Sequence, residues 1–339
     1  MSVNIAVLGA GVVGLSTAIN VQQSIPSARV TVIADKFFED TTSYGAGGMF
    51  IPSRLASPNV PVEDLRNWCR ESWKFYRQLA LSPEAGDIGT MIMSGYHLIN
   101  KPLSAEDPLY QEFVFNSQEM SRSELNDLGF QQFRTGYRVT TVIIYMRKYL
   151  TWLQKRFEQN GGMFEKRHVN SIGELSEQYD VVMNCCGPGS GRLVSDTRTH
   201  PTRGHIVRVR APWIKHWFLT DGETYIIPGE DLVGLGTVRQ VGNTSLDVDP
   251  RDTKNIIEGC EKLCPNVKGA QVDHEWVGLR PGRDRIRLEP EVCHFGNKRL
   301  PVVHNYGHSS QGIGLSWGTA VYAAKLAAEI LSSKSGSKL

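Results

Sequence analysis

Short apolar runs and glycine-rich turns alternate along the first part of the chain. An apolar run covers residues 3–8, and the glycines of Gly9–Gly14 follow it directly. A helical stretch to about residue 24 comes next, and a β-branched run over 30–33 ends at Asp35. Continuous apolar runs of this length are typical of parallel strands that are covered on both faces. The pattern therefore predicts a strand, a glycine turn, a helix and a second strand.

Helical and strand-like periodicities are mixed through the rest of the chain. Helices are predicted over 62–81, 145–160 and 252–263 and, after a late glycine-rich loop, to about residue 331. Strands are predicted near 91–99, 179–186, 205–210, 224–228, 231–239, 273–280 and 300–306. No internal repeat or long linker separates them. The expected fold class is α/β, with a Rossmann-type nucleotide-binding domain interleaved with an antiparallel-sheet α+β domain.

The glycine turn carries the pattern Gly9-x-Gly11-x-x-Gly14. Such a turn lets the backbone approach a pyrophosphate, which then meets free N–H groups and the positive end of the helix. Asp35 ends the second strand, where a carboxylate can accept the ribose 2′-hydroxyl. The alternative is a tight structural turn with no ligand. A carboxylate at Asp35 favours FAD or NAD over NADP.

Two further glycine-rich segments favour FAD over NAD. Gly45-Ala46-Gly47-Gly48 follows the first unit, and residues 307–314 open the last helix. A long cofactor that spans the molecule explains both, with the isoalloxazine ring beside Gly47–Met49 and the helix that begins near 312. The N-terminus of that helix could stabilise negative charge on the reduced ring. An ordinary flexible loop is the alternative for 307–314.

Composition narrows the other classes of function. The chain has 339 residues with 37 basic and 35 acidic side chains, so its net charge of +2 comes with no basic block of the kind that binds nucleic acid. No apolar run is long enough to span a membrane. The six cysteines suggest neither a disulfide scaffold nor a metal site, and we expect a reducing compartment. The terminal Ser337-Lys338-Leu339 is of the type read by the peroxisomal import receptor.

Two arginines each follow an apolar strand-like run, Arg239 in GTVRQ and Arg280 in VGLRP. A buried guanidinium is costly unless it is paired, and its planar fork fits a carboxylate with two hydrogen bonds. Two such groups suggest a ligand with two carboxylates, to which the Tyr225 hydroxyl could add a donor. Structural ion pairs for the arginines, and a packed core position for Tyr225, are the alternatives. His304 and His308 are expected to be structural.

Several blocks of the chain resemble the D-amino-acid oxidase family over nearly its whole length. They are IAVLGAGVVGLSTA, GAGGM, NCCGPGS, TYIIPG, GLGTVRQ, VGLRP and LPVVHNYGH with GIGLSWGTA after it. The arginine in GTVRQ points to the branch that acts on acidic substrates. The resemblance implies an FAD domain formed by 1–54, 145–195 and 278–339, and a substrate domain formed by 55–144 and 196–277.

The resemblance also implies roles for single residues. Arg280 and Tyr225 match the positions that hold the substrate α-carboxylate. Arg239 matches the position that pairs with the side-chain carboxylate. Ser310 matches the position whose backbone carbonyl accepts a hydrogen bond from the substrate amine. The residues expected to contact FAD are Gly9, Gly11, Val12, Val13, Gly14, Asp35, Lys36, Thr41, Thr42, Ser43, Gly47, Gly48, Met49, Val169, Gly187, Gly312, Ile313, Gly314 and Leu315.

The implied reaction is oxidative deamination of acidic D-amino acids, D-aspartate or D-glutamate. A hydride passes to flavin N5, the imino acid hydrolyses to a 2-oxo acid and ammonia, and O2 reoxidises the flavin to give H2O2. No side-chain base and no metal are expected, and a peroxide product fits the peroxisomal matrix. The alternatives are a neutral D-amino-acid oxidase or a glycine/sarcosine-type oxidase on the same fold, and a dinucleotide-binding sensor without activity. The chain departs from its relatives in the loop after His308, in a shorter segment after Phe218, and at Ser53-Arg54.

Overall fold

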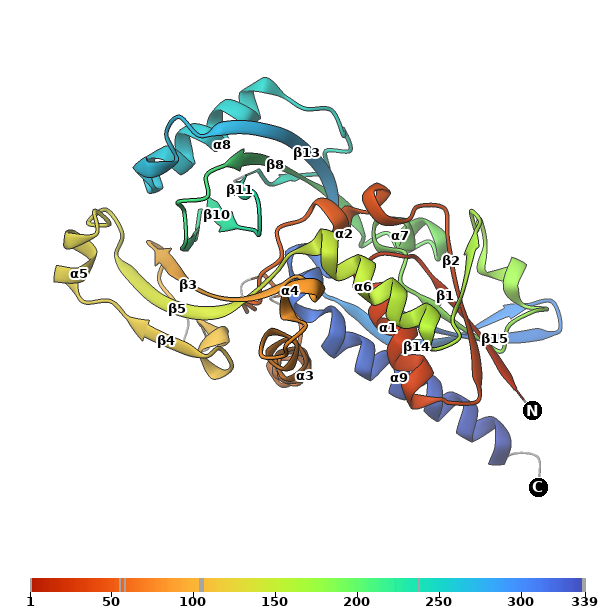
Figure 1. The fold of residues 1–339 in the computed structure, drawn as a ribbon. Helices are drawn as coiled ribbons and strands as arrows, with labels where there is room; N and C mark the ends of the chain where they lie inside the picture. The colour runs from red at the N-terminus through yellow and green to blue at the C-terminus, as the bar shows by residue number, and fades with distance from the viewer. Residues whose placement is uncertain are drawn as a thin grey trace.

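Two sheets lie side by side in the computed structural model of the chain (Figure 1). The structure describes residues 2–54, 56–57, 59–103, 107–222, 224–236 and 238–336. Both ends of the described chain lie on the side of the first sheet, away from the second.

The first sheet has six strands in the order β14-β15-β7-β1-β2-β6. Their bounds are β1 Val3–Leu8, β2 Ala28–Ala34, β6 Met163–Lys166, β7 Val181–Asn184, β14 Arg287–Phe295 and β15 Lys298–Tyr306. The five strands from β15 to β6 are parallel, and only β14 at the edge is antiparallel to its neighbour. Four helices share the main core of this half: α1 Val12–Ser24, α3 Val62–Ala80, α6 Met146–Gln159 and α9 Gly312–Gly336.

The second sheet has nine strands, with eight in the order β12-β8-β11-β10-β9-β3-β5-β4 and β13 paired to β8. Their bounds are β3 Thr90–Ile99, β4 Asn116–Glu119, β5 Thr135–Ile144, β8 His200–Arg210, β9 Trp217–Thr220, β10 Tyr225–Pro228, β11 Val233–Gly236, β12 Gln240–Val241 and β13 Gln271–Gly282. All pairs are antiparallel except β3 with β9. Helix α8, Pro250–Leu263, shares a core with β8 and β11.

Short elements link these layers. They are the helices α2 Thr42–Gly45, α4 Ala85–Ile88, α5 Arg122–Asp127 and α7 Ser190–Leu193, and the 3-10 turns Phe38–Asp40, Leu109–Glu112, Ile172–Leu175, Gly187–Gly189, Pro265–Val267 and Ser309–Gln311. Residues 221–224 join β9 to β10. None of the helices described in the structure is long and apolar enough to cross a membrane.

The predicted strand, glycine turn, helix and second strand are all present at the N-terminus. Gly9 has φ +103°, and a Cβ on it would lie 2.6 Å from the carbonyl oxygen of Cys185, which directly follows the neighbouring strand β7. A Cβ on Gly14 would lie 1.9 Å from the Gly9 carbonyl oxygen. The turn therefore needs both glycines, because α1 packs directly on the backbone that precedes it.

The strands of the first sheet all come from the three ranges assigned to the FAD domain. Those of the second sheet come from the other two ranges, except that β13 continues to Gly282, past the expected boundary at 277/278. Helix α3 also lies across the expected division, because its buried face packs in the core that contains α9. The apolar face expected for this helix is buried, including Leu65, Trp68 and Tyr76.

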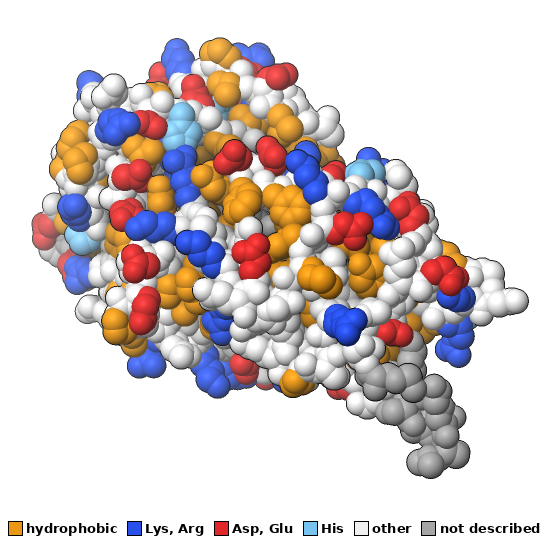
Figure 2. Space-filling model, turned by 45° about the vertical axis from the view of Figure 1, so that its right-hand side comes forward, with side chains coloured by type: hydrophobic (Ala, Val, Ile, Leu, Met, Phe, Trp, Pro, Cys, Tyr) orange, Lys and Arg blue, Asp and Glu red, His pale blue; other side chains and the backbone are white. Residues whose placement is uncertain are grey.

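Five observed strands are not among those expected from the sequence: β4, β5, β6, β9 and β14. The predicted strand at 231–239 is divided into β11 and β12, separated by the segment that carries Arg239. All six cysteines are free thiols. On the face shown in Figure 2, basic and acidic side chains are interspersed, with no field of one sign.

Asp196 connects the ends of the two sheets. Its side chain is 8% exposed, and its carboxylate accepts from Tyr306 Oη of β15 at 2.7 Å and from Arg283 Nε, just beyond β13, at 2.8 Å. Burial alone would raise the pKa of Asp196, but these hydrogen bonds and the Arg283 charge outweigh it and lower the pKa to about 2. The ionised carboxylate therefore stabilises the junction between the sheets.

We predict that Asp196→Asn lowers the free energy of unfolding by about 2 kcal/mol near pH 6. The loss should shrink as the pH falls from about 4 toward 2, because the lowered pKa makes this contribution present above the unfolded-state value and absent below the folded-state value. Urea unfolding at several pH values measures it. Asp127→Asn, at an exposed carboxyl of α5, is the control and should change little; an equal loss at all pH values would contradict the prediction.

Candidate functional site

A cavity of about 1250 Å³ lies between the two sheets and is lined by residues from both. It includes all four predicted substrate contacts, Tyr225, Arg239, Arg280 and Ser310. It also includes most of the predicted FAD contacts: Gly9, Gly11, Val12, Val13, Asp35, Lys36, Thr41, Thr42, Ser43, Gly47, Met49, Val169, Gly187, Gly312, Ile313 and Gly314. Residues scattered from one end of the chain to the other thus meet at one cavity.

Three predicted FAD contacts do not line this cavity. Gly14 lies beneath the turn, where it allows α1 to pack on Gly9. Gly48 packs on β5, and a Cβ there would lie 2.0 Å from the Ile144 carbonyl oxygen. The Leu315 side chain is fully buried in the core beneath α9. The Cβ directions of the two glycines and the Leu315 side chain face the protein interior, so these residues could meet FAD only through their backbone, and their contact with FAD stays a prediction.

The N-terminus of α1 opens onto the cavity at the glycine turn. Gly11 is the N-cap residue and has no side chain to occupy the free N–H groups of the first turn. Ser43 Oγ accepts from the Val12 N–H at 3.1 Å, which brings the segment after β2 against the same helix end. The open helix end and the close backbone approach fit a pyrophosphate.

Asp35 lies at the end of β2, on the cavity wall. Its carboxylate oxygen is 2.8 Å from His168 Nδ1, a residue that the sequence analysis did not single out. Burial raises the pKa of Asp35, but the hydrogen bond and charge of His168 and a backbone hydrogen bond bring the pKa below its ordinary value. The carboxylate is therefore ionised at neutral pH and can accept from a ribose hydroxyl.

The glycine-rich segment after α2 is held from behind by Arg208 of β8. Its Nη2 donates to the carbonyl oxygen of Gly45 at 3.1 Å, and a Cβ on Gly45 would clash with Trp276 of β13. Burial lowers the pKa of Arg208. The hydrogen bond to the Gly45 carbonyl oxygen fixes the position of its side chain. No sequence signal marked Arg208 or Trp276, because their role depends on strands that are distant in the chain.

Arg280 and Tyr225 occupy space that two glycines leave open in the second sheet. A Cβ on Gly204 would lie 2.5–2.7 Å from the Arg280 guanidinium, and one on Gly236 would lie 2.2 Å from Tyr225 Oη. Gly236 pairs with Ile206, two residues from Gly204 on the same strand face, so the two side chains cross the sheet at neighbouring positions. The sheet therefore brings a guanidinium and a hydroxyl together above its surface.

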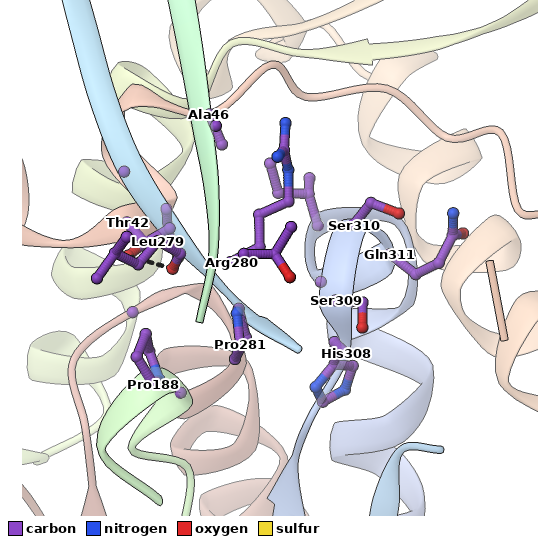
Figure 3. Close-up of a pocket in the computed structure, with 18 of the residues that line it drawn as sticks. Thr42, Ala46, Pro188, Leu279, Arg280, Pro281, His308, Ser309, Ser310 and Gln311 are labelled. Carbon is purple, nitrogen blue, oxygen red and sulfur yellow. Dashed lines mark hydrogen bonds between the residues drawn. The ribbon is translucent and has the colours of Figure 1, made fainter. Parts of the chain in front are cut away.

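The Arg280 side chain points into the cavity between Ala46 and the Ser309–Gln311 turn (Figure 3). It is half-buried, and its Nη1 donates to the carbonyl oxygens of Val238 at 3.1 Å and Arg203 at 3.4 Å. No carboxylate pairs with it within the described parts of the chain. Its charge is thus available to an anion that enters the cavity.

The other two predicted substrate residues lie at the rim. Arg239 is exposed and lines the cavity just before β12, and Ser310 is exposed in the turn that leads into α9. His308 lies beneath this turn, where its Nε2 meets Thr319 Oγ1 at 3.1 Å and burial lowers its pKa to about 4. His304 Nε2 is 2.9 Å from Glu291, a partner supplied by the β14–β15 pair.

The described residues fit FAD. The chain supplies an open helix end beside a glycine turn, an ionised carboxylate at the tip of β2, and a continuous cavity from that turn to Arg280. The residues that would hold the adenosine diphosphate half lie around Gly9–Val13 and Asp35. Those that would border the ring lie around Gly47–Met49 and Gly312–Gly314.

We predict that Asp35→Ala weakens FAD binding about tenfold, because it removes a charge-assisted hydrogen bond to the ribose. Titration of the apoprotein with FAD, followed by flavin fluorescence, measures the affinity. Asp40→Ala is the control, since Asp40 also lines the cavity but does not end a strand. Equal affinities for the Asp35 variant and the unmodified chain would contradict the assignment.

Solved structures with the same arrangement have low sequence identity. Glycine oxidase from Bacillus cereus matches with a TM-score of 0.76 at 18% identity, covering 97% of this chain and 96% of that chain. L-proline dehydrogenase from P. horikoshii matches with a TM-score of 0.75 at 13% identity, covering 97% and 94%. These likenesses show a shared fold.

Sequence comparisons give closer relatives. Human D-aspartate oxidase is 41% identical over 327 residues, covering 96% of this chain and 94% of that protein. D-amino acid oxidase of Dugesia ryukyuensis is 34% identical, covering 97% and 98%, and D-aspartate oxidase 1 of Caenorhabditis elegans is 33% identical, covering 98% and 99%. The family model described as FAD dependent oxidoreductase, DAO, matches residues 4–326. With the cavity, the glycine turn and nearly full-length matches in agreement, the chain belongs to the DAO family of FAD-dependent oxidoreductases.

Proposed function

We propose that this chain is an FAD-dependent oxidase that deaminates acidic D-amino acids, D-aspartate and D-glutamate, to the 2-oxo acid, ammonia and hydrogen peroxide. Membership of the DAO family supports the FAD-dependent chemistry. Two of the similar proteins named above are D-aspartate oxidases. Residues that border the cavity support the preference for acidic side chains.

The observation that carries the proposal is the half-buried Arg280 guanidinium in the cavity. Its partners in the described chain are two carbonyl oxygens, which leave its positive charge without a counter-ion. A substrate α-carboxylate supplies the missing negative counter-ion and fits the planar guanidinium with two hydrogen bonds. Tyr225 Oη, held across Gly236, supplies a further donor to the same carboxylate.

Arg239 supports a second carboxylate on the substrate. It follows Val238, whose carbonyl oxygen accepts from Arg280, and β8 lies between β12, which begins directly after Arg239, and β13, which carries Arg280. Two positively charged groups at one cavity favour a substrate with two carboxylates over a substrate with one. Arg239 is also the feature that argues against the neutral D-amino-acid and glycine/sarcosine alternatives.

The residues of the chain bind and orient the substrate. Arg280 and Tyr225 fix the α-carboxylate, Arg239 fixes the distal carboxylate, and the Ser310 backbone carbonyl accepts from the amine. Three fixed points on the substrate determine which face of Cα presents its hydrogen, and this orientation is the main catalytic contribution of the protein. Bound FAD supplies the two-electron acceptor, which O2 reoxidises.

No side-chain base is part of the proposal. Burial lowers the pKa of both His97 and His308, which line the cavity, to about 4. Both imidazoles are neutral near pH 7, and the nearest partner of each is a hydroxyl group, Tyr110 Oη for His97 and Thr319 Oγ1 for His308. We expect the substrate amine to react in its unprotonated form.

We predict that Arg280→Ala nearly abolishes activity on every D-amino acid, whereas Arg239→Ala lowers kcat/KM for D-aspartate far more than for D-alanine. Loss of a charge-assisted bidentate contact should cost about 2–3 kcal/mol, roughly a 30- to 150-fold change in kcat/KM. Peroxide release across D- and L-aspartate, glutamate and alanine measures the pattern.

The two variants should keep their flavin spectra, which controls for folding and cofactor loss. A parallel loss of D-aspartate and D-alanine activity in both variants would refute the proposed roles of the two arginines. Wild-type activity on D-alanine above that on D-aspartate would favour the neutral-substrate alternative.

We also propose that the enzyme acts in the peroxisomal matrix, with Ser337-Lys338-Leu339 recognised by the import receptor. These three residues lie outside the described residues. The support is the sequence itself and the peroxide product of the proposed reaction.

We predict that a fluorescent protein fused to the N-terminus of this chain is found in peroxisomes, and that deletion of 337–339 disperses it. Microscopy with a peroxisomal marker checks this, and Leu339→Ala is the single-residue counterpart. Unchanged peroxisomal fluorescence after the deletion would show that the address lies elsewhere.

A further inference from the structure

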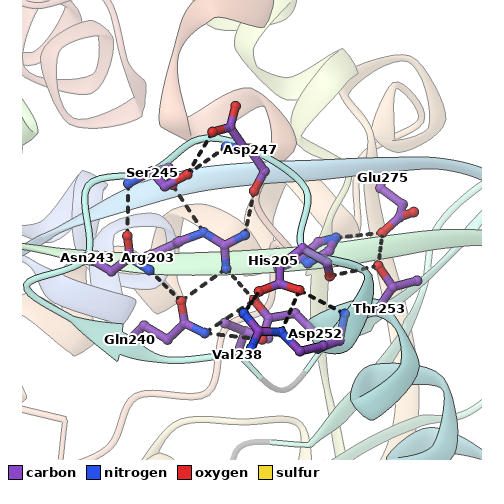
Figure 4. Close-up of polar contacts among 12 residues, drawn as sticks. Arg203, His205, Val238, Gln240, Asn243, Ser245, Asp247, Asp252, Thr253 and Glu275 are labelled. Carbon is purple, nitrogen blue, oxygen red and sulfur yellow. Dashed lines mark hydrogen bonds and ion pairs between the residues drawn. The ribbon is translucent and has the colours of Figure 1, made fainter.

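A buried polar cluster lies on β8, the strand between β12 and β13 (Figure 4). Its centre is Arg203 of β8, which is 2% exposed. Its guanidinium donates to four groups: Gln240 Oε1 at 3.2 Å, Asp252 Oδ2 at 2.6 Å, the Ser245 carbonyl oxygen at 3.1 Å and the Asp247 carbonyl oxygen at 2.7 Å.

The cluster holds three separate segments against β8. Gln240 belongs to β12, and the two carbonyl groups belong to the loop between β12 and α8. Asp252 lies in the first turn of α8. Gln240 also donates through Nε2 to both oxygens of Asp252, at 3.1 and 3.2 Å. The Gln240 side-chain amide thus bridges the Arg203 guanidinium and the Asp252 carboxylate. The chain from the end of β11 to the first turn of α8 is therefore attached to β8 at one buried point.

Stability alone is a weak reason for such a cluster. A buried ion pair adds little over an apolar cluster of the same volume, because desolvation offsets most of the attraction. What it does provide is one defined arrangement, since every donor and acceptor must meet its partner. The cluster therefore contributes mainly a defined geometry of the segments that it joins.

Both predicted carboxylate-binding arginines are tied to this cluster through the backbone. In the sheet, Arg203 pairs with Gln240 on one side and with Leu279 on the other. Arg239 directly precedes Gln240, and Arg280 directly follows Leu279. Arg280 also donates to the backbone carbonyl of Arg203 itself and to that of Val238.

We infer that Arg203, Gln240 and Asp252 are positioning residues that set the separation of the Arg239 and Arg280 guanidinium groups, and through it the length of dicarboxylate that the site accepts. The inference rests on the proposed function. D-aspartate and D-glutamate differ by one methylene group, and a site with two fixed charges discriminates them by the distance between those charges. A loose Arg239 would accept both lengths equally.

Gln240→Met is the main test variant. Methionine keeps the length and volume of the half-buried side chain but removes the amide bridge, and Arg203 keeps its ion pair with Asp252. Asp252→Asn is a second variant that removes the charge. Neither residue lines the cavity, so a change in ligand choice must act through neighbouring residues that do, among them Arg239 and Arg280.

The chain offers a matched control on the same strand and helix. His205 Nε2 lies 2.8 Å from Glu275, and Thr253 of α8 donates to the same carboxylate at 2.5 Å. Figure 4 shows this pair beside the Arg203 cluster. Among the described residues, no hydrogen bond or ion pair joins this pair to Gln240 or Arg280, so Glu275→Gln perturbs the α8–sheet contact without touching the segment that carries Arg239.

The experiment measures dissociation constants of three unreactive acids for the holoenzyme by perturbation of the flavin absorbance. Succinate has the carboxylate spacing of D-aspartate, glutarate has that of D-glutamate, and butyrate has one carboxylate only. For Gln240→Met and Asp252→Asn, we expect weaker binding of the preferred dicarboxylate by about tenfold, a succinate-to-glutarate ratio near one, and butyrate binding within twofold of the wild type.

Glu275→Gln should keep the wild-type ratio. A wild-type enzyme that binds butyrate as tightly as either dicarboxylate would refute the proposed acidic preference itself. Wild-type discrimination that persists in Gln240→Met and Asp252→Asn would overturn the positioning inference alone. An equal loss of discrimination in Glu275→Gln would also overturn it, because the effect would then be general loosening of the sheet.

Discussion

The site depends on a positive charge that no carboxylate among the described residues neutralises. Within the described chain, Arg280 is half-buried and its partners are two backbone carbonyls. A guanidinium in that position is costly without a counter-ion, so the binding of a carboxylate relieves a cost that folding has already imposed. The charge is held in place because β13 is the longest strand and pairs with β8 along its length.

Glycines make this arrangement possible in the middle of a sheet. Gly204 and Gly236 have no side chains where Arg280 and Tyr225 cross, and the absent Cβ atoms become the space for a guanidinium and a ring. Glycine in a strand interior is normally destabilising, since it loses backbone entropy and packs nothing. Here the larger neighbouring side chains fill the gap, and the sheet stays continuous beneath them.

Interleaving of the two halves places the ligand-binding groups. The chain passes between the two sheets several times, and the glycine segment after α2 and the end of β13 reach the cavity at two of these passages. The turn after β1 and the turn before α9 reach it from the first sheet. Asp196 reinforces the junction by joining β15 to the end of β13. A cofactor that spans the cavity and a substrate beside it can therefore contact residues from both ends of the chain.

Local chemistry made part of the structure predictable from the sequence. The N-terminal βαβ unit, the amphipathic face of α3 and the last strand and helix have strong periodicity and turn signals, and each was found where expected. Strand β4 (NSQE) has no apolar residue and β6 (MFEK) has only two, so neither shows the apolar run that marked the equally short β7 and β10. β5 contains the β-branched run VTTVII, a strand signal that the sequence analysis did not use. β14 contains Pro290, which by sequence argues against a strand, and it forms at the sheet edge by pairing with β15.

By itself, the sequence determined the type of chemistry: glycines that let a backbone approach phosphates, an acid at a strand end, and arginines after apolar strands. These are properties of residue types and short spacings, so they can be read without coordinates. Tertiary structure alone decided which glycines face the cavity and which, like Gly14 and Gly48, face the interior. It also decided that Arg203 and Asp252 lie behind the site, because contacts between strands distant in the chain leave no local pattern.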